Sequence, residues 1–245
     1  MFSALVMFST GDIVGLVLVY SYVTLVVVIA VFAKKRYPGC GYRKIIHILI
    51  GNIVFLWWVF DSNYIMAFLA AAPFIPLLLL MTPRSPLHRF DGSFLKMATA
   101  QGHDLGLVYY AFSWTLLAFF LFDNRMVASI AIVAMSYGDG VGGLVGKQYG
   151  KLKCYKDKSY VGTAAVFLGT FAATLAVIGF YTFLSGHVAG LNVLDLSTTK
   201  ALMVASIVGA FVAVVELFSP GEYDNLIVPI STALLVLGLE SLMGA

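Results

Sequence analysis

Three acidic side chains, Asp139, Glu216 and Asp224, adjoin long apolar runs of the sequence. An ionisable group in such a run is costly to bury, so each of them is a functional candidate by default. Carboxylate oxygens are ligands that Mg²⁺ takes in proteins. We therefore expect the three carboxylates to converge at one depth, where Asp139 and Asp224, with Glu216, would bind Mg²⁺ or another divalent cation.

The segment around Asp139 is rich in glycine. Gly138, Gly142, Gly146 and Gly150 recur every four residues, a spacing that places small residues on one face of a helix and lets another backbone approach closely. Packing explains the glycines, but a packing surface has no need of a carboxylate. The spacing predicts a helix contact beside Asp139 and leaves a chemical role for its carboxylate.

Lysines crowd the connection that follows. Five of them stand within twelve residues, and a serine and a glycine follow where the next helix is expected to begin. Lysine side chains and the backbone N–H groups of a helix N-terminus both attract phosphate. We interpret the connection as a nucleotide-binding segment; the alternative is that its lysines only set the orientation in the membrane. The candidate nucleotide-binding residues are Lys147, Lys151, Lys156, Lys158, Ser159, Gly162 and Thr163, and Lys158 joins Asp139 and Asp224 as a catalytic candidate.

A further group of candidates lies earlier in the chain. Lys44, His47 and Gly51 share one helical face, and we assign Arg43, Lys44 and His47 to substrate binding or support. A single histidine in a helix is more often a hydrogen-bonded packing residue than a catalyst. Asn225 follows Asp224 and serves either as a helix cap or as support for the site.

The elements that must position these residues are membrane helices. Of the 245 residues, 61% are hydrophobic and 11% are charged, with a mean hydropathy of +0.96, whereas soluble domains carry roughly 25% charged residues. A helix that spans the bilayer needs about 20 apolar residues. The apolar runs predict an all-α polytopic membrane protein, a single integral membrane domain over residues 1–245. Its eight expected transmembrane helices cover about residues 12–33, 44–60, 64–81, 104–122, 126–147, 161–184, 199–217 and 225–243.

The basic residues predict the orientation of these helices. Thirteen of the 15 Lys and Arg residues fall beside the connections that follow the first, third and fifth helices, and Arg125 and Lys200 are the exceptions. By the positive-inside rule these connections face the cytosol and both termini lie on the non-cytosolic side. The candidate acids lie at the cytosolic ends of their helices, so the active site is expected to face the cytosol. The connection over residues 81–103 is expected to be a cytosolic loop or an interfacial helix in contact with membrane lipids.

Two cysteines stand in the basic connections, Cys40 and Cys154. A structural disulfide is not expected in the cytosol, and two thiols without a neighbouring histidine do not make a zinc site.

These segments together resemble the polyprenol kinase family of membrane enzymes, which includes dolichol kinase, phytol kinase and CTP-dependent diacylglycerol kinase. The resemblance extends in order over residues 43–229 and covers most of the chain. It is carried by Arg43-Lys44 with His47 and Gly51, Gly138-Asp139 with Gly142, Gly146 and Gly150, Lys158-Ser159 with Gly162-Thr163, and Glu216 with Asp224-Asn225 and Pro229. Val161 stands where the family pattern has an acid, and Asp157 interrupts what is often a pair of lysines.

The resemblance implies transfer of a phosphoryl group from CTP to the hydroxyl of a polyprenol- or dolichol-type alcohol. Mg²⁺ would be required, and the partners would be CTP, a long-chain lipid alcohol and membrane lipids, without nucleic acid. Asp139 or Asp224 would accept the hydroxyl proton, with His47 as a third choice.

Two other functions compete with this hypothesis. A cytidylyltransferase would use the same lysines and acids to make a CDP-lipid; the related CDP-diacylglycerol synthases end in an Asp-Arg signature with a further Asp, whereas Leu226 follows Asp224-Asn225 here. A secondary transporter would place its ionisable groups near the membrane midplane on paired repeats, and the acids here gather near one face without an apparent repeat.

Overall fold

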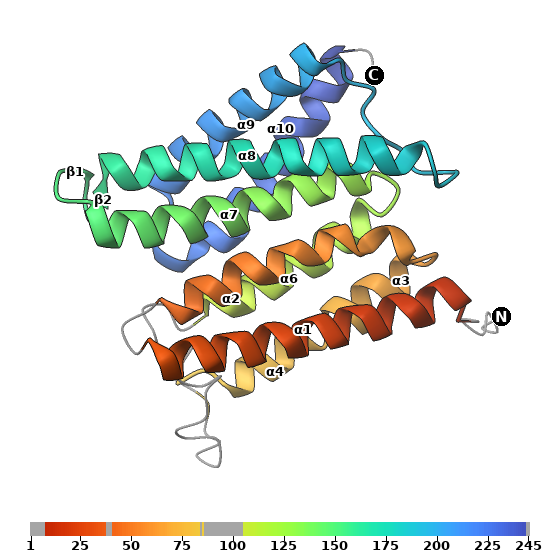
Figure 1. Ribbon diagram of the computed structural model, residues 1–245, viewed down its shortest axis with the longest axis horizontal. Helices are drawn as coiled ribbons and strands as arrows, with labels where there is room; N and C mark the ends of the chain where they lie inside the picture. Colours follow the sequence, from red (N-terminus) through yellow and green to blue (C-terminus); the bar gives the residue numbers. More distant parts are fainter. Residues whose placement is uncertain (1–7, 38–40, 84, 86–104, 244–245) are drawn as a thin grey trace.

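The computed structural model describes residues 8–37, 41–83, 85 and 105–243. Within these residues the chain is almost entirely helical (Figure 1). The first half contains α1 (Thr10–Arg36), α2 (Tyr42–Gly51), η1 (Asn52–Phe55), η2 (Trp57–Val59), α3 (Asn63–Ile65), η3 (Met66–Ala71) and α4 (Phe74–Leu80). The second half contains α6 (Gly106–Phe120), α7 (Arg125–Tyr149), β1 (Lys153–Tyr155), β2 (Lys158–Ser159), α8 (Tyr160–Ser185), α9 (Thr198–Phe218), η5 (Gly221–Tyr223) and α10 (Asp224–Met243).

The predicted all-α polytopic membrane fold is confirmed. In the part of the chain that the structure describes, seven helical segments are long and apolar enough to cross a membrane, and α6 is a shorter apolar helix in the place of the expected fourth span. Two of the expected spans are broken. The second consists of α2 followed by the 3₁₀ turns η1 and η2, and the third contains the π-helix η3 before Pro73 and Pro76.

Helix α7 is the centre of the bundle, and its residues 126–136 are all buried. Helix α8 runs beside it (Figure 1) because glycines remove the side chains between them. A Cβ atom on Gly146 would lie 3.2 Å from the Cα of Gly162, and one on Gly142 would lie 3.3 Å from the Gly162 carbonyl oxygen. The helix contact predicted from the glycine spacing is thus confirmed.

The ends of the bundle differ in composition. The end of α1, with Lys34, Lys35 and Arg36, lies at the same end as the β1–β2 hairpin, whereas the beginning of α1 and the end of α10 lie at the opposite end (Figure 1). Most of the 81–103 connection, with its Arg84, Arg89 and Lys96, lies outside the described residues, as does Cys40. Cys154 forms no disulfide within them.

Candidate active site

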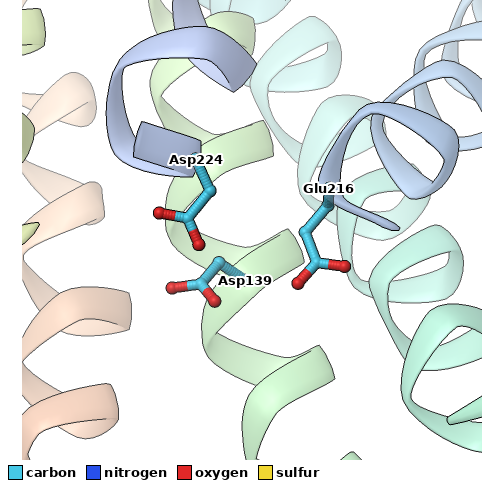
Figure 2. Close-up of side chains that lie close together, drawn as sticks. All are labelled: Asp139, Glu216 and Asp224. Atoms are coloured by element: carbon cyan, nitrogen blue, oxygen red, sulfur yellow. The ribbon is translucent and has the colours of Figure 1, made fainter. Parts of the chain in front are cut away.

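Three carboxylates lie close together and point toward one another (Figure 2). Asp139 comes from α7, Glu216 from the end of α9 and Asp224 from the first residue of α10. Each offers an oxygen atom, and these oxygens all lie within 4.8 Å of one another. All three residues are buried, with exposed fractions of 8%, 5% and 7%. The convergence expected from the sequence is therefore present in the fold.

The turn between α9 and α10 brings two of these acids together. Helix α9 ends before Ser219-Pro220, and the short 3₁₀ helix η5 reverses the chain into α10. Gly221 has a φ of 54°, a conformation that glycine adopts without steric cost. Glu216 and Asp224 thus stand on either side of a tight reversal and face Asp139 on the central helix.

Two lysines partly balance the negative charge. The Lys44 ammonium lies 2.5 Å from both carboxylate oxygens of Asp139, and the Lys158 ammonium donates to Glu216 Oε1. Burial alone lowers the pKa of Lys158, but the adjacent Glu216 carboxylate outweighs burial and raises that pKa above its ordinary value. Lys158 is therefore a cation at neutral pH.

His47 is the next residue in contact with the acids. Its Nε2 lies 3.5 Å from Asp139 Oδ2, and the residue is only 4% exposed. The ring packs on Tyr110, with centroids 4.4 Å apart. Gly51, on the same face of α2, meets Ser136 of α7. The face of Lys44, His47 and Gly51 that the spacing predicted is thus turned towards α7.

Asn225 holds one of the carboxylates in place. Its side-chain amide and its backbone N–H both donate to Asp224 Oδ1, at 2.9 and 2.7 Å. Glu222 lies outside the acid cluster and accepts a hydrogen bond from the Leu105 amide at 2.7 Å, so it ties η5 to the start of α6. Arg43 is half-buried in the first turn of α2.

The lysine-rich connection forms a small antiparallel hairpin, in which Lys153 pairs with Ser159 and Tyr155 with Lys158. This register directs Lys158 to Glu216. The other candidate lysines, Lys147, Lys151 and Lys156, are exposed and form no described ion pair with the three acids.

The remaining candidates of this connection have structural contacts. Ser159 caps α8 by accepting a hydrogen bond from the Gly162 amide at 3.1 Å, and Gly162 packs against Gly146. Thr163 lies beside Cys154, with 3.7 Å between Oγ1 and Sγ. Their nucleotide-binding role stays a prediction.

One feature near the acids was not predicted from the sequence. A cavity of about 170 Å³ lies among α1, α2, the segment η3–α4 and α6, and His47 is part of its wall. One sequence signal for this cavity was available. The spacing of its lining residues in α6 places them on one helical face: Leu107, Tyr110, Ala111 and Trp114.

The donor set fits a divalent cation. Three clustered carboxylates carry more negative charge than Lys44 and Lys158 neutralise, and oxygen ligands suit Mg²⁺, which binds through one or two carboxylates together with substrate phosphates. The cluster can therefore hold a metal ion and the phosphates of a nucleotide beside it.

No protein-family model and no solved structure matches the sequence. Among curated proteins, the chain is 30% identical over 199 residues to a phytol kinase of Synechocystis sp., covering 79% of this chain and 76% of that protein. It is 28% identical over 202 residues to a probable chloroplastic phytol kinase of Triticum aestivum, covering 78% of this chain and 65% of that protein. A chloroplastic farnesol kinase of Arabidopsis thaliana is 26% identical over 146 residues, 57% of this chain and 48% of that protein.

The match to the Synechocystis protein extends over more than three quarters of both chains. It agrees with the motifs that carried the resemblance in the sequence. The chain belongs to the polyprenol kinase family of isoprenoid alcohol kinases, represented here by phytol and farnesol kinases.

Proposed function

We propose that the protein is an Mg²⁺-dependent kinase that transfers the γ-phosphoryl group of CTP to the hydroxyl of an isoprenoid alcohol at the cytosolic face of the membrane. The observation that carries the proposal is the convergence of Asp139, Glu216 and Asp224 beside two lysines. The sequence favoured a polyprenol- or dolichol-type acceptor. Because the curated relatives are named phytol and farnesol kinases, we place alcohols of those types first.

Asp139, Asp224 and Glu216 would hold the metal ion. Bound there, Mg²⁺ would neutralise charge that develops on the phosphates during transfer. The protein contributes the positions of the three carboxylates, which come from α7, α9 and α10, and the two hydrogen bonds from Asn225 that orient Asp224.

The cations of the site would bind the triphosphate. Lys158 and Lys44 are directed at the acids, so each can turn from a carboxylate to a phosphate oxygen over a short distance. The exposed lysines Lys147, Lys151 and Lys156 would attract and orient the nucleotide from the cytosol, together with the start of α8 at Ser159, Gly162 and Thr163. Such contacts accelerate transfer when they strengthen in the transition state.

The alcohol oxygen would attack the γ-phosphorus, the bond from the γ-phosphorus to the bridging oxygen would break, and CDP would leave. We assign the hydroxyl proton to His47. Asp139 is engaged by Lys44 and Asp224 by Asn225, whereas His47 Nε2 is buried and has no hydrogen-bond partner among the described residues. His47 also stands between Asp139 and the apolar cavity, where an alcohol would present its oxygen.

The products of the reaction test the proposal. Purified protein is incubated with labelled CTP or ATP and with farnesol, phytol, a dolichol or diacylglycerol, with and without a chelator. We expect phosphorylated isoprenoid alcohol and CDP, loss of turnover with the chelator and recovery with Mg²⁺. Pyrophosphate and a CDP-lipid would instead show a cytidylyltransferase.

A His47→Gln variant tests the proton acceptor. We expect kcat to fall by roughly a hundredfold, within the range that general-base groups contribute, while the KM for CTP changes little. An unchanged kcat would return the role to Asp139 or Asp224.

A further inference from the structure

We propose that the cavity beside His47 binds the isoprene units nearest the hydroxyl of the acceptor, while the rest of the tail lies in the membrane. The inference rests on the proposed function for the identity of the acceptor. It adds the place where the enzyme recognises the alcohol and the part of the alcohol that it recognises.

The wall of the cavity is almost wholly apolar. Helix α1 contributes Val19, Val23 and Val27, and the other walls come from the face of α2 that continues to Trp57 in η2, from η3 and α4, and from α6. The lining residues from Ile46 to Trp57 follow one another from α2 through η1 into η2. The cavity is thus elongated along the helices and offers an alkyl chain hydrophobic contact without hydrogen bonds.

His47 connects the cavity to the acid cluster. This residue lines the cavity and also lies 3.5 Å from Asp139. Tyr110 lines it too, but its hydroxyl is already bonded to the His47 carbonyl oxygen at 3.2 Å and to Ser136 Oγ at 2.8 Å. An alcohol whose carbon chain occupies the cavity therefore brings its oxygen to His47 and to the acid cluster.

The volume limits what the cavity can hold. An apolar cavity of about 150 Å³ holds a benzene-sized molecule, so the 170 Å³ found here accommodates roughly six to eight carbon atoms. That is about one to two isoprene units, and the tails of farnesol and phytol are longer. The enzyme would thus recognise the head of the chain and tolerate different tail lengths.

The π-helix η3 supplies an independent indication of function. π-Helical turns are rare in proteins, and those that occur often lie at functional sites. Met66, Ala70 and Ala71 of η3 all line the cavity, and the small alanine side chains leave the space that the chain would fill. A membrane phospholipid acyl chain is the competing occupant, and competition with a brominated phospholipid distinguishes it from the alcohol.

Ala71→Leu fills the cavity, and Ala72→Leu is the matched control. Ala71 lines the cavity, whereas the adjacent Ala72 is half-buried and does not. We expect Ala71→Leu to raise the KM for farnesol and phytol roughly tenfold, the effect of displacing about two methylene groups, without changing the KM for CTP. In the wild type, kcat/KM should rise with chain length up to about two isoprene units and then level off. Equal acceptor KM values for the two variants would overturn the inference.

Binding is measured separately from turnover with a brominated farnesol, which quenches tryptophan fluorescence at short range. Trp57 and Trp114 line the cavity, and their ring centroids are 4.8 Å apart. The chain contains one other tryptophan, Trp58. A Trp58→Phe background therefore restricts the signal to the cavity. We expect saturable quenching that Ala71→Leu weakens and Ala72→Leu does not.

The two proposals fail in different ways. Quenching that depends on Ala71, without turnover of any alcohol, would reject the kinase and support an isoprenoid-binding cavity. The cavity inference would be overturned if the enzyme turns over the alcohol but quenching is equal in Ala71→Leu and Ala72→Leu. It would also be overturned if a brominated phospholipid displaces farnesol stoichiometrically. Either result would leave the proposed kinase activity intact. If Ala71→Leu does not accumulate, Ala111→Leu fills the same space from α6 with the same expectations.

Discussion

Asp139 lies between two side chains that come from a helix almost one hundred positions earlier in the sequence. Lys44 contacts both of its oxygens, and His47 lies beside one of them. In the proposed reaction this carboxylate would hold a metal ion in place of its contact with Lys44, and His47 would stay next to the acceptor. The function of the residue thus depends on a charge balance that its neighbours set.

Asp139→Asn should abolish phosphotransfer, with turnover reduced at least a hundredfold, because an amide keeps the shape of the side chain but does not bind a metal ion as a carboxylate does. The variant should remain folded, since Lys44 is about a third exposed and water can solvate its charge. Turnover is measured in detergent at saturating nucleotide and Mg²⁺. The exposed Asp157→Asn serves as control, and wild-type turnover in Asp139→Asn would remove the residue from the metal site.

Lys158→Ala separates nucleotide binding from membrane orientation. Orientation depends on the summed charge of many residues, so the loss of one lysine should leave insertion unchanged. If Lys158 contacts phosphate, its loss should slow turnover by roughly a hundredfold. Lys35→Ala, at an exposed position in the last turn of α1, is the control. Equal activities at equal expression would mean that Lys158 serves only the orientation.

At the scale of elements, the site depends on how closely α7 and α8 approach. The glycines of α7 let the start of α8 lie against it, and the hairpin before α8 then delivers Lys158 to Glu216. A wider spacing of the two helices would separate Lys158 from the acids without changing any residue of the cluster.

Gly146→Val should therefore lower both stability and activity. The new side chain would meet the backbone of Gly162, and overpacking of this kind costs about 1–3 kcal/mol, seen as a lower Tm in detergent. Gly179→Val in α8 is the matched control, because a Cβ there meets nothing within 4 Å. Equal Tm values for the two variants would show that the helices do not need the glycine contact.

The sequence allowed some of these features to be predicted and not others, for physical reasons. Asp139, Glu216 and Asp224 were identifiable because an acid in an apolar run is a local signal. The contact between Asp139 and Lys44 joins residues far apart in the sequence, so local spacing does not predict it. Local charge alone does not distinguish Lys158 from Lys151; the motif of Lys158-Ser159 with Gly162-Thr163 singled out Lys158, and the hairpin register brings it to Glu216.

Some features of the helices could likewise be predicted from the sequence, and others could not. Hydropathy predicted apolar helices along the chain, and seven described segments are long and apolar enough to cross a membrane, because that requirement acts on composition and length. The breaks at η1, η2 and η3 were missed, because the segments that contain them are still apolar enough to read as spans. Pro73 and Pro76 were the available sign that the third segment is irregular.

At the scale of the whole molecule, the basic last turn of α1 lies at the same end of the bundle as the β1–β2 hairpin (Figure 1), and Lys158 of this hairpin contacts Glu216 of the acid cluster. The positive-inside rule predicts that this end faces the cytosol, where nucleotides are available. The alcohol would approach from the other direction, from the lipid phase.

Cys154 allows the orientation to be measured. In a Cys40→Ser background, a membrane-impermeant maleimide should label Cys154 only after the cells are permeabilised, because the hairpin is expected to face the cytosol. Asn192→Cys in a cysteine-free background, at an exposed position between α8 and α9, should be labelled in sealed cells. The reverse pattern would invert the topology and place the site on the other side of the membrane.

The three carboxylates come from different helices, and this determines at which stage of its synthesis the protein can become active. Because Asp224 opens α10 while its partners come from α7 and α9, a nascent chain still held by the ribosome before α10 has inserted contains most of the fold but only part of the acid cluster. Under the proposed mechanism, such an unfinished chain cannot use CTP. Truncated or stalled translation products would then stay inert in the membrane, and catalytic competence itself would report that synthesis had passed the turn between α9 and α10.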